Sequence, residues 1–438
     1  MLKTTLFGAA GVSGTTGFIV VENKTSNASI YDQAMSYDGQ GGVFMLYYAP
    51  SYPSSVHLLK FSSSGILQCG RVLKSNVDLI EASICNRPDG GTFIAGLVWF
   101  GSDIGNQGFI VKYSSDGSLL WQKFTNWAAD TSLDSVVSDK SSSSLYALGA
   151  ETPNGRLLCK FDSQTGGVTS SVWLDGIPGT PILGDTDSFG NVYIVSKSTP
   201  TITKITYSTS SGTASWCYQF TIGYECYLND LVVDGNNNIY VALISRSYSS
   251  ATTTFILVKM STSGLIQWSK GFTVNSEIGT CSAYRGISVS SSGDIYLTCS
   301  YLSGPNVQYT TNITKFSQDG TVLWQREMRC DQGLTITTSS RAAVVGDALW
   351  SSSTLMLASG QAVGLVLSPR VDGSTLGSYA AGSYATVTYS PGTRSVSDVS
   401  NVGMTPVVVM TSPMVLSITN GTLTSQTSEL SYTSYNFS

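Results

Sequence analysis

The stretch VKYSSDGSLLWQKF, residues 111–124, decides the fold because close copies of it recur along the chain. Two further copies are TKFSQDGTVLWQREM at 314–328 and VKMSTSGLIQWSKGF at 258–272. A fourth, LKFSSSGILQCGRV at 59–72, carries Cys69 where the others carry Trp. The shared pattern is a Lys, an apolar or aromatic residue, a turn with Gly, and a Trp four residues after the Gly.

Two looser copies place Lys160 before Trp173 and Lys204 before Trp216. The repeated lysines then lie 52, 48, 44, 55 and 56 residues apart, which is too regular for chance. A fixed period of this length is the sequence signature of a repeat architecture. The six lysines are Lys60, Lys112, Lys160, Lys204, Lys259 and Lys315.

A second pattern lies upstream of each Lys: a turn rich in Asp, Gly and Asn, then an apolar residue and an aromatic one. The aromatic positions are Phe44, Phe93, Tyr146, Tyr193, Tyr240, Tyr296 and Trp350. A weaker eighth copy is TPVVVM at 405–410. Both turns use residues that tolerate tight-turn dihedrals, and the flanking runs are β-branched and aromatic, so each unit is expected to form two hairpins.

Four short strands in each unit of about 50 residues predict an all-β chain, folded as a β-propeller with four-stranded antiparallel blades. A single blade cannot bury both of its faces, whereas blades stacked around a ring bury each face against a neighbour. We expect one domain over residues 1–438. Its repeats are expected near 31–73, 78–124, 132–174, 181–220, 228–272, 282–328 and 337–380.

The two ends of the chain are expected to close the ring. Residues 17–21 resemble residues 108–112, and the run 396–411 resembles a first hairpin. Pairing the two ends would add a composite blade after seven full repeats, which gives eight blades. Residues 1–30 and 395–438 would then close the ring or form an attachment segment. Seven blades, with the C-terminal region outside the ring, is the alternative.

The repeated lysines allow two interpretations. Each can lay its aliphatic stem along an aromatic face and keep its ammonium in water, or the six can form an inward ring that binds anions. We favour packing between blades, because the residue after Lys changes from Tyr to Phe to Met without breaking the pattern. The repeated Trp and Tyr are expected to pack between blades as well.

Charged residues make up only 12% of the 438 residues, about half the usual share. This composition excludes a coiled coil and a disordered acidic tail, and a net charge of −5 argues against nucleic-acid binding. The weakly apolar start is interrupted by Gly, Ser and Thr, so we expect an unprocessed chain without a signal peptide. No apolar run is long enough for a membrane helix. The eight scattered cysteines are expected to be free, mostly buried thiols.

No catalytic constellation is evident, and we predict no catalytic, metal or cofactor-binding residues. His57 is the single histidine and is expected in a surface loop. The run 234–238 (DGNNN) has the oxygen ligands of a calcium loop but is better interpreted as a hairpin turn. Paired carboxylates for glycoside cleavage stay open. Candidates for such a pair are Asp130, Asp134, Asp185 and Asp187, although an Asp at the start of a blade more often caps a turn.

The second hairpin resembles the tryptophan-docking repeat of quinoprotein-like propellers through Asp-Gly-x-x-x-Trp at 116–121 and 319–324. The first hairpin (VDGNNNIYVAL, VSSSGDIYLTC) resembles bacterial β-propeller repeats. These resemblances cover most of 31–380 and imply the fold rather than a function. The low charge and abundant Ser, Thr and Gly also resemble structural or receptor-binding proteins of bacteriophage tails.

Three functions follow from these observations. The first is a non-enzymatic structural or receptor-binding component of a bacteriophage virion, a tail-fibre or adhesin protein present in several copies. Its partners would be other virion or surface proteins and a host glycan or receptor, and its location the virion, with secretion or the cell surface as the alternative. The second is a carbohydrate-binding lectin propeller, with Trp99, Trp127 and Tyr301 stacking on sugars. The third is a quinone-dependent or glycan-degrading enzyme.

Overall fold

The computed structural model describes residues 17–22 and 31–436 apart from short internal gaps. The gaps are 50–53, 75–77, 88, 100–104, 126–129, 142, 152–154, 180, 197–198, 208–210, 223–224, 248–251, 276–285, 304–307, 331–334, 339–342, 346–347, 357–361, 369–371, 375–376, 382–384, 393, 401, 409, 415–417, 421–423 and 428–430. Strands and turns, and no helix, make up the described residues, which confirms the all-β class. A search of the same residues therefore finds no helix that could span a membrane.

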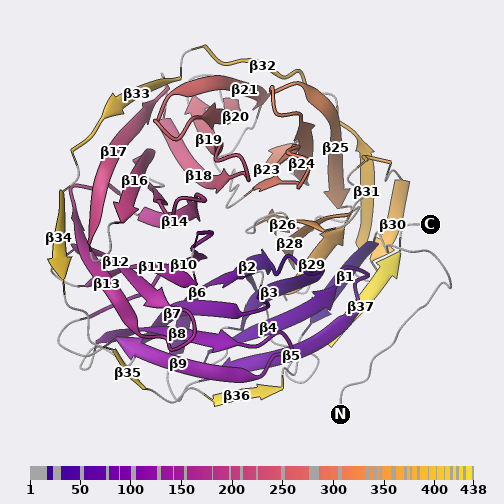
Figure 1. Cartoon of the computed structure of the whole chain (residues 1–438). Helices are drawn as coiled ribbons and strands as arrows, with labels where there is room; N and C mark the ends of the chain where they lie inside the picture. The colour runs from indigo at the N-terminus through magenta and orange to yellow at the C-terminus, as the bar shows by residue number, and fades with distance from the viewer. Residues whose placement is uncertain are drawn as a thin grey trace.

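The described strands form seven sheets arranged around a ring, so the chain is a β-propeller (Figure 1). Each of the first six sheets is built on four consecutive antiparallel strands, and we call these sheets blades 1 to 6. The strands of blades 1 to 3 are β2 (Tyr31–Tyr37), β3 (Gly42–Ala49), β4 (Ser55–Ser62) and β5 (Leu67–Lys74); β6 (Asp78–Asn86), β7 (Thr92–Trp99), β8 (Asn106–Tyr113) and β9 (Leu119–Thr125); β10 (Ser135–Ser138), β11 (Ser144–Glu151), β12 (Gly155–Asp162) and β13 (Val168–Asp175).

Blades 4 to 6 repeat this plan, and blade 7 uses both halves of the chain. The strands of blades 4 to 6 are β14 (Pro181–Thr186), β15 (Val192–Ser196), β16 (Thr201–Tyr207) and β17 (Gly212–Thr221); β18 (Glu225–Val233), β19 (Ile239–Ser247), β20 (Thr252–Met260) and β21 (Ile266–Asn275); β22 (Ile287–Val289), β23 (Ile295–Ser303), β24 (Gln308–Phe316) and β25 (Val322–Cys330). Blade 7 consists of β26 (Thr335–Thr338) and β27 (Ala343–Val345), which both pair with β28 (Ala348–Met356), then β29 (Ala362–Ser368) and the N-terminal strand β1 (Gly17–Glu22).

The expected eight blades are wrong, and the alternative of seven agrees with the number of sheets that the described strands form. Strand β1 completes blade 7 by pairing with β29, from Gly17 opposite Ser368 to Val21 opposite Gly364. It does not form a composite blade with 396–411. That run reads as extended chain, but an apolar alternating pattern does not tell which strand a segment pairs with.

The hydrophobic core lies between the blades. One cluster of buried side chains joins each neighbouring pair around the ring, including blade 7 with blade 1 and blade 6 with blade 7. All seven repeated aromatic residues are at most 1% exposed, as the packing interpretation requires. The six cysteines whose side chains the structure describes are all free thiols, and five of them are buried. Burial raises the pKa of Cys226 to about 12.

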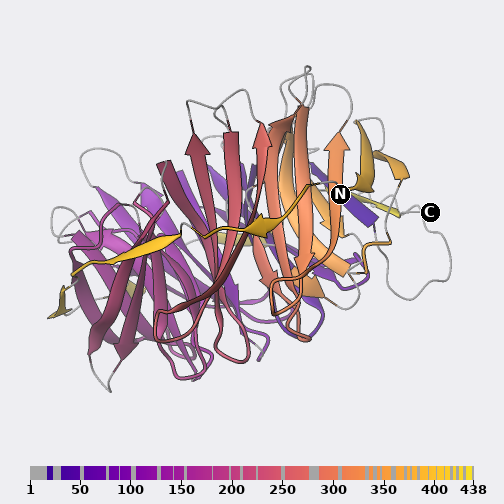
Figure 2. The same ribbon diagram turned by 90° about the horizontal axis from the view of Figure 1, so that it is seen from above.

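The C-terminal segment runs around the outside of the ring and adds one strand to every blade (Figure 1). We call residues 385–436 the belt. Its strands visit the blades in the reverse of their chain order, from blade 6 back to blade 1 and then blade 7. Figure 2 shows the belt crossing the outer side of the disc. The belt strands are β31 (Ala385–Pro391) on β25, β32 (Ser397–Asp398) on β21, β33 (Gly403–Pro406) on β17, β34 (Met410–Met414) on β13, β35 (Ile418–Asn420) on β9, β36 (Thr424–Thr427) on β5 and β37 (Ser431–Asn436) on β1, with β30 (Gly377–Ala381) outside β31.

A buried ion pair fixes the beginning of the belt. The Nε of Arg394 lies 3.2 Å from Oε1 of Glu327, whose side chain is only 6% exposed. The hydroxyl of Tyr301 donates to the same oxygen at 2.8 Å, and the Arg394 guanidinium lies 5.2 Å from the Tyr301 ring centroid. Arg329 binds the other Glu327 oxygen at 3.2 Å. The belt is therefore tied to blade 6 by a side chain as well as by backbone pairing.

Replacing Arg394 with Ala is expected to lower the free energy of unfolding by about 1–3 kcal/mol, because a buried carboxylate loses a charged donor. Lys270→Ala is the matched control. It removes the other described ion pair of the belt, at 2.7 Å, whose Asp398 side chain is 76% exposed, and it should change stability little. Urea denaturation of both variants makes the comparison. Equal effects would show that the Glu327 contact does not anchor the belt.

Candidate functional site

The repeated lysines join the blades. In each copy the Lys lies over the aromatic ring of its own blade, with Nζ between 5.0 and 5.8 Å from the ring centroid. The register explains the sequence spacing: Tyr240, Lys259 and Trp268 stand opposite one another on three strands, and a bulge follows Lys259. Of the two interpretations of the repeated lysines, packing on an aromatic ring is therefore confirmed, and an inward ring of anion-binding ammonium groups is not.

The ammonium groups of Lys204 and Lys259 keep partial exposure, but each also binds an acceptor in the next blade, which the sequence did not predict. Lys259 Nζ donates to the Gln318 carbonyl of the next blade at 3.0 Å, and Trp268 Nε1 donates to the same oxygen at 3.1 Å. Lys204 and Trp216 share the Thr262 carbonyl in the same way, each at 3.2 Å. We call this arrangement the blade latch. It joins a partly exposed cation and an indole N–H of one blade to a hairpin carbonyl of the next, so it couples neighbouring blades.

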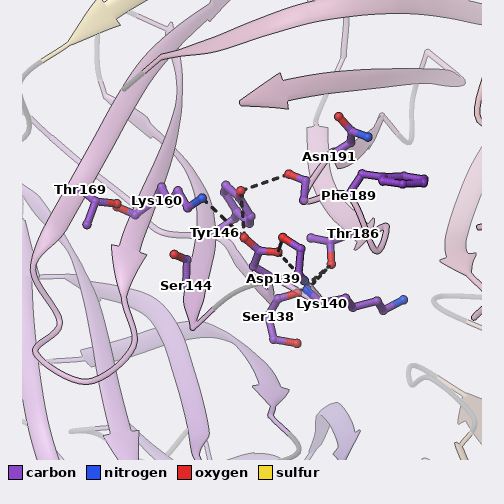
Figure 3. Close-up of polar contacts among 12 residues, drawn as sticks. Ser138, Asp139, Lys140, Ser144, Tyr146, Lys160, Thr169, Thr186, Phe189 and Asn191 are labelled. Carbon is purple, nitrogen blue, oxygen red and sulfur yellow. Dashed lines mark hydrogen bonds and ion pairs between the residues drawn. The ribbon is translucent and has the colours of Figure 1, made fainter. Parts of the chain in front are cut away.

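A network of polar side chains also joins blades 3 and 4, and it involves the turn of the first hairpin in each blade (Figure 3). We call the boundary between two neighbouring blades a seam. Lys160 Nζ lies 3.5 Å from the carboxylate of Asp139, which is 3% exposed. The Tyr146 hydroxyl donates to Asp139 at 3.3 Å and lies 3.2 Å from the Gly190 carbonyl of the next blade. Burial, with help from the Asp139 charge, raises the pKa of Tyr146 above its usual range.

The turn that contains Gly190 is held by a buried carboxylate. Asp187, which is 0% exposed, accepts from the backbone N–H groups of Phe189 at 3.0 Å and Asn191 at 2.9 Å. Its other oxygen accepts from the Asn191 amide at 2.7 Å and from the Tyr193 hydroxyl at 3.0 Å. These four bonds fix the turn in one conformation.

The ring of Phe189 stands out from this turn with 75% of its surface exposed. The N–H of Ser188 beside it donates at 2.9 Å to the side-chain oxygen of Asn237 in blade 5. Asn237 has a φ of 64°, and it is the one non-glycine residue of the described chain with positive φ. An aromatic ring is therefore presented on a rigid support that two blades share.

A charged pair lies close by in the chain, where blades 3, 4 and 5 meet. Lys140 Nζ lies 2.6 Å from Oδ2 of Asp185 and donates to the Val233 carbonyl at 2.8 Å. Asp185 Oδ2 also accepts from the Val233 N–H at 2.9 Å. The side chains of Lys140 and Asp185 keep 39% and 15% of their surface exposed. In Figure 3, Lys140 and Phe189 extend to the same side, away from Lys160.

The carboxylates considered for glycoside cleavage are each engaged by a donor of their own. Asp187 caps its turn and Asp185 pairs with Lys140. Asp134 lies 3.2 Å from Arg156, and Asp130 accepts from the Asn106 N–H at 2.7 Å. The residues 234–238 form a hairpin turn, as predicted, with Asp234 accepting from two backbone N–H groups. Among the described residues no group of three or more His, Cys, Asp or Glu is placed to hold a metal ion.

The expected exposure of His57 and Tyr301 is wrong, whereas Trp99 is exposed as expected. His57 lies within β4 and is only 3% exposed, with a ring nitrogen 3.0 Å from the Ser55 hydroxyl. Tyr301 is fully buried against Glu327, so it offers no ring to a sugar. Trp99 is 43% exposed, and Trp127 lies outside the described residues. Phe189 was missed, although an aromatic residue in a turn whose sister turns carry Gln40 or Asn236 at the same place was a usable signal.

Comparisons with known proteins do not place the chain in a family. No family model matches the chain, and no curated protein matches it. A putative 6-phosphogluconolactonase from Bacteroides fragilis is 14% identical, with a TM-score of 0.44 over 72% of this chain and 95% of its own. The acylaminoacyl peptidase of Pyrococcus horikoshii is 12% identical, with a TM-score of 0.42 over 80% of this chain and 54% of its own. This chain therefore spans about half of that peptidase.

The expectation of a non-enzymatic bacteriophage component is corrected by these comparisons. The tail fibre of Staphylococcus aureus phage P68 matches with a TM-score of only 0.15 and 8% identity, whereas the better matches are enzymes. At these identities the likeness does not carry any activity to this chain. The predicted role as a non-enzymatic virion component and the exclusion of enzymatic activity are therefore wrong, whereas the predicted location stays a prediction.

Trp268→Phe is expected to lower the free energy of unfolding by about 1 kcal/mol, because it keeps the ring but removes the Nε1 donor to the Gln318 carbonyl. Thermal unfolding followed by circular dichroism measures the change. Trp99→Phe serves as the control at a half-exposed ring and should leave the melting temperature unchanged. The same melting temperature in both variants would mean that the latch bond adds nothing to stability.

Stability is expected to fall as the pH rises above 10, the ordinary pKa of tyrosine. Burial, with help from Asp187 and Asp234, raises the pKa values of Tyr193 and Tyr240 in the folded state. The unfolded chain then loses more protons than the folded chain above pH 10, so alkali favours unfolding. The last part of the phenolate absorbance should appear together with the loss of the circular dichroism signal. Complete ionisation of the 23 tyrosines while the fold persists would contradict this.

Proposed function

We propose that the chain is a carbohydrate-binding propeller that takes its ligand at the Phe189 turn. The observation that carries the proposal is the Phe189 ring, which is three-quarters exposed. It stands on a turn that is held by four hydrogen bonds accepted by the Asp187 carboxylate. A rigid platform loses little conformational entropy when a ligand covers it, so exposed aromatic area of this kind supports binding.

The chemistry around the ring favours a sugar over an apolar ligand. One face of a pyranose ring carries mainly C–H groups and packs on an aromatic face, while its hydroxyls need hydrogen-bond partners. Lys140 extends to the same side as Phe189 in Figure 3, and its Nζ pairs with the partly exposed Asp185 carboxylate, so the pair offers a donor and an acceptor. A neutral glycan is also a suitable ligand for a chain with few charged residues. Binding of a glycan would be consistent with a secreted protein or one displayed at a cell surface, where glycans are abundant.

Cleavage of the bound glycan is the second candidate, and the Lys140–Asp185 pair is the observation that favours it. The pair holds a carboxylate 2.6 Å from an ammonium, and both side chains keep part of their surface exposed, so a carboxylate oxygen that can accept a proton from water is available beside a charged donor. The assay that tests binding therefore also measures newly formed reducing ends, and Asp185→Asn separates the two roles. That variant would abolish release of product and keep most of the binding.

Phe189→Ala is expected to weaken glycan binding about tenfold or more, because it removes the stacking surface and leaves the turn intact. A glycan array identifies the ligand, and calorimetric titration of that glycan measures the loss. Trp99→Ala is the matched control, since it removes another exposed ring at the end of β7. Failure of every glycan on the array to bind, or equal binding by Phe189→Ala and the unsubstituted chain, would overturn the proposal.

A further inference from the structure

The chain after β29 forms a turn that lies where the second hairpin of a complete blade 7 would have its own. Gly373 has a φ of 75°, and its carbonyl accepts from Nε of Arg326 in blade 6 at 2.6 Å. In the same way, the Gly117 carbonyl of blade 2 accepts from Nε of Arg71 in blade 1 at 2.6 Å. The turn 372–374 is therefore held on blade 6 as the second turn of one blade is held on the blade before it.

The sequence of this turn and of the residues after it follows the repeat. The run DGSTLG at 372–377 matches DGTVLW at 319–324, which forms the second turn and the start of β25 in blade 6. In both turns the Asp carboxylate accepts from the backbone N–H two residues later, at 2.8 and 3.2 Å. The chain is thus prepared at this point to begin a fourth strand of blade 7.

The spacing gives β30 the same register in blade 7 that β1 has. In blades 1, 2, 5 and 6 the turn glycine comes five residues after the repeated Lys, and the residue four positions after that glycine stands opposite the Lys. In blade 7, Gly373 comes five residues after Ser368, so Gly377 is the residue expected opposite Ser368. Gly17 holds that position. Two segments of the chain, β1 (GFIVV in its first five residues) and β30 (GSYAA), therefore fit one place in the sheet.

In this structure β1 fills the place, and β30 lies at the outer edge of the sheet of blade 6 (Figure 1). There β30 pairs with β31 through five residue pairs, which it would give up on entering blade 7. The sequence of β1 also has Phe, Ile and two Val where β30 has Ser, Tyr and two Ala, so β1 brings more apolar surface to the sheet. The arrangement with β1 in blade 7 is therefore the more stable one as long as β1 is available.

We infer that β30 takes the place of β1 as the fourth strand of blade 7 when β1 leaves the sheet. Gly377 then stands opposite Ser368 and Ala381 opposite Gly364, the partners that β1 has now. Strand β37, which pairs with the other side of β1, pairs with β30 instead. The turn 372–374 already lies in position, so the change begins after it. The ring stays closed while its N-terminal strand is released.

A double-mutant cycle tests this replacement in the full-length chain. Strand β1 is paired on both sides, so Val20→Pro removes an N–H that a neighbouring strand needs and drives β1 out of the sheet. Tyr379→Pro does the same to β30 in blade 7. Each variant alone is expected to fold, with a lowered midpoint of urea unfolding. Together they should lower the midpoint by more than the sum of the separate shifts, because no strand is left to complete blade 7.

The matched control combines Val20→Pro with a proline in a belt strand far from blade 7. Thr411 on β34 pairs with β13 of blade 3, and Thr411→Pro should add its shift to that of Val20→Pro without any excess. Additive shifts for Val20→Pro with Tyr379→Pro would overturn the inference. A Val20→Pro chain that does not fold would overturn it as well, since β30 would then fail to replace β1.

A disulfide reports the register of the replaced strand. Val366 and Tyr379 stand opposite Ile19 and Val387 in this structure and would stand opposite each other only after the replacement. With Val366→Cys and Tyr379→Cys, mild oxidation should link the two positions in the Val20→Pro chain and at least tenfold less in the chain with an intact β1. Trypsin cuts the chain between them, so mass spectrometry detects the linked peptides apart from any bridge between native cysteines.

The control for register moves one cysteine by a single residue. Ala380→Cys in place of Tyr379→Cys turns the thiol to the other face of the sheet, so it should link poorly to Val366→Cys. Equal linkage by both pairs, or no linkage at Tyr379→Cys in the Val20→Pro chain, would overturn the inference. None of these readouts depends on a ligand.

Discussion

Packing of one blade against the next is the interaction on which the rest of the structure depends. No blade has a core of its own, since every cluster of buried apolar side chains among the described residues is shared by two neighbours. The blade latch gives this packing its register. A Lys and a Trp that meet on one hairpin carbonyl of the next blade set the angle and height at which two sheets come together. A ring built this way is stable only when it is closed, which is the task of β1 on β29.

The same packing explains where the few charges of this chain are placed. The repeated lysines and the turn carboxylates Asp139, Asp187 and Asp234 are drawn into the seams between blades, where rings and backbone groups satisfy them. Charges buried in this way tie neighbouring blades together. The Phe189 turn shows that the junction between blades can also support a site, because Tyr146 of blade 3 and Asn237 of blade 5 bind the backbone of this turn from both sides.

The sequence predicted the features that repeat and failed where a feature occurs once. The spacing of Lys112 and Trp121 is set by an antiparallel hairpin with one bulge, so it could be interpreted without a structure. The hydrogen-bond acceptor of the lysine ammonium could not be predicted in the same way. It is a backbone carbonyl in another repeat, and the residue type does not show which carbonyl is available. The eighth blade failed for a related reason: TPVVVM is extended, but it pairs with β17 and β13 rather than with a hairpin of its own. Phe189 is a single departure from the repeat, and such departures are where a site was to be sought.

The direction of the belt has a consequence for how the protein is made. Synthesis proceeds from the N-terminus, so the strands of all seven blades, β1 to β29, leave the ribosome before the belt does. The first strand must also wait for β29 before its blade is complete. During translation of the belt, the chain therefore holds a nearly finished ring with every outer edge still bare. Crowding of nascent chains on one messenger would then favour contacts between neighbours at this stage, and the speed at which the last codons are read sets how long that exposure lasts.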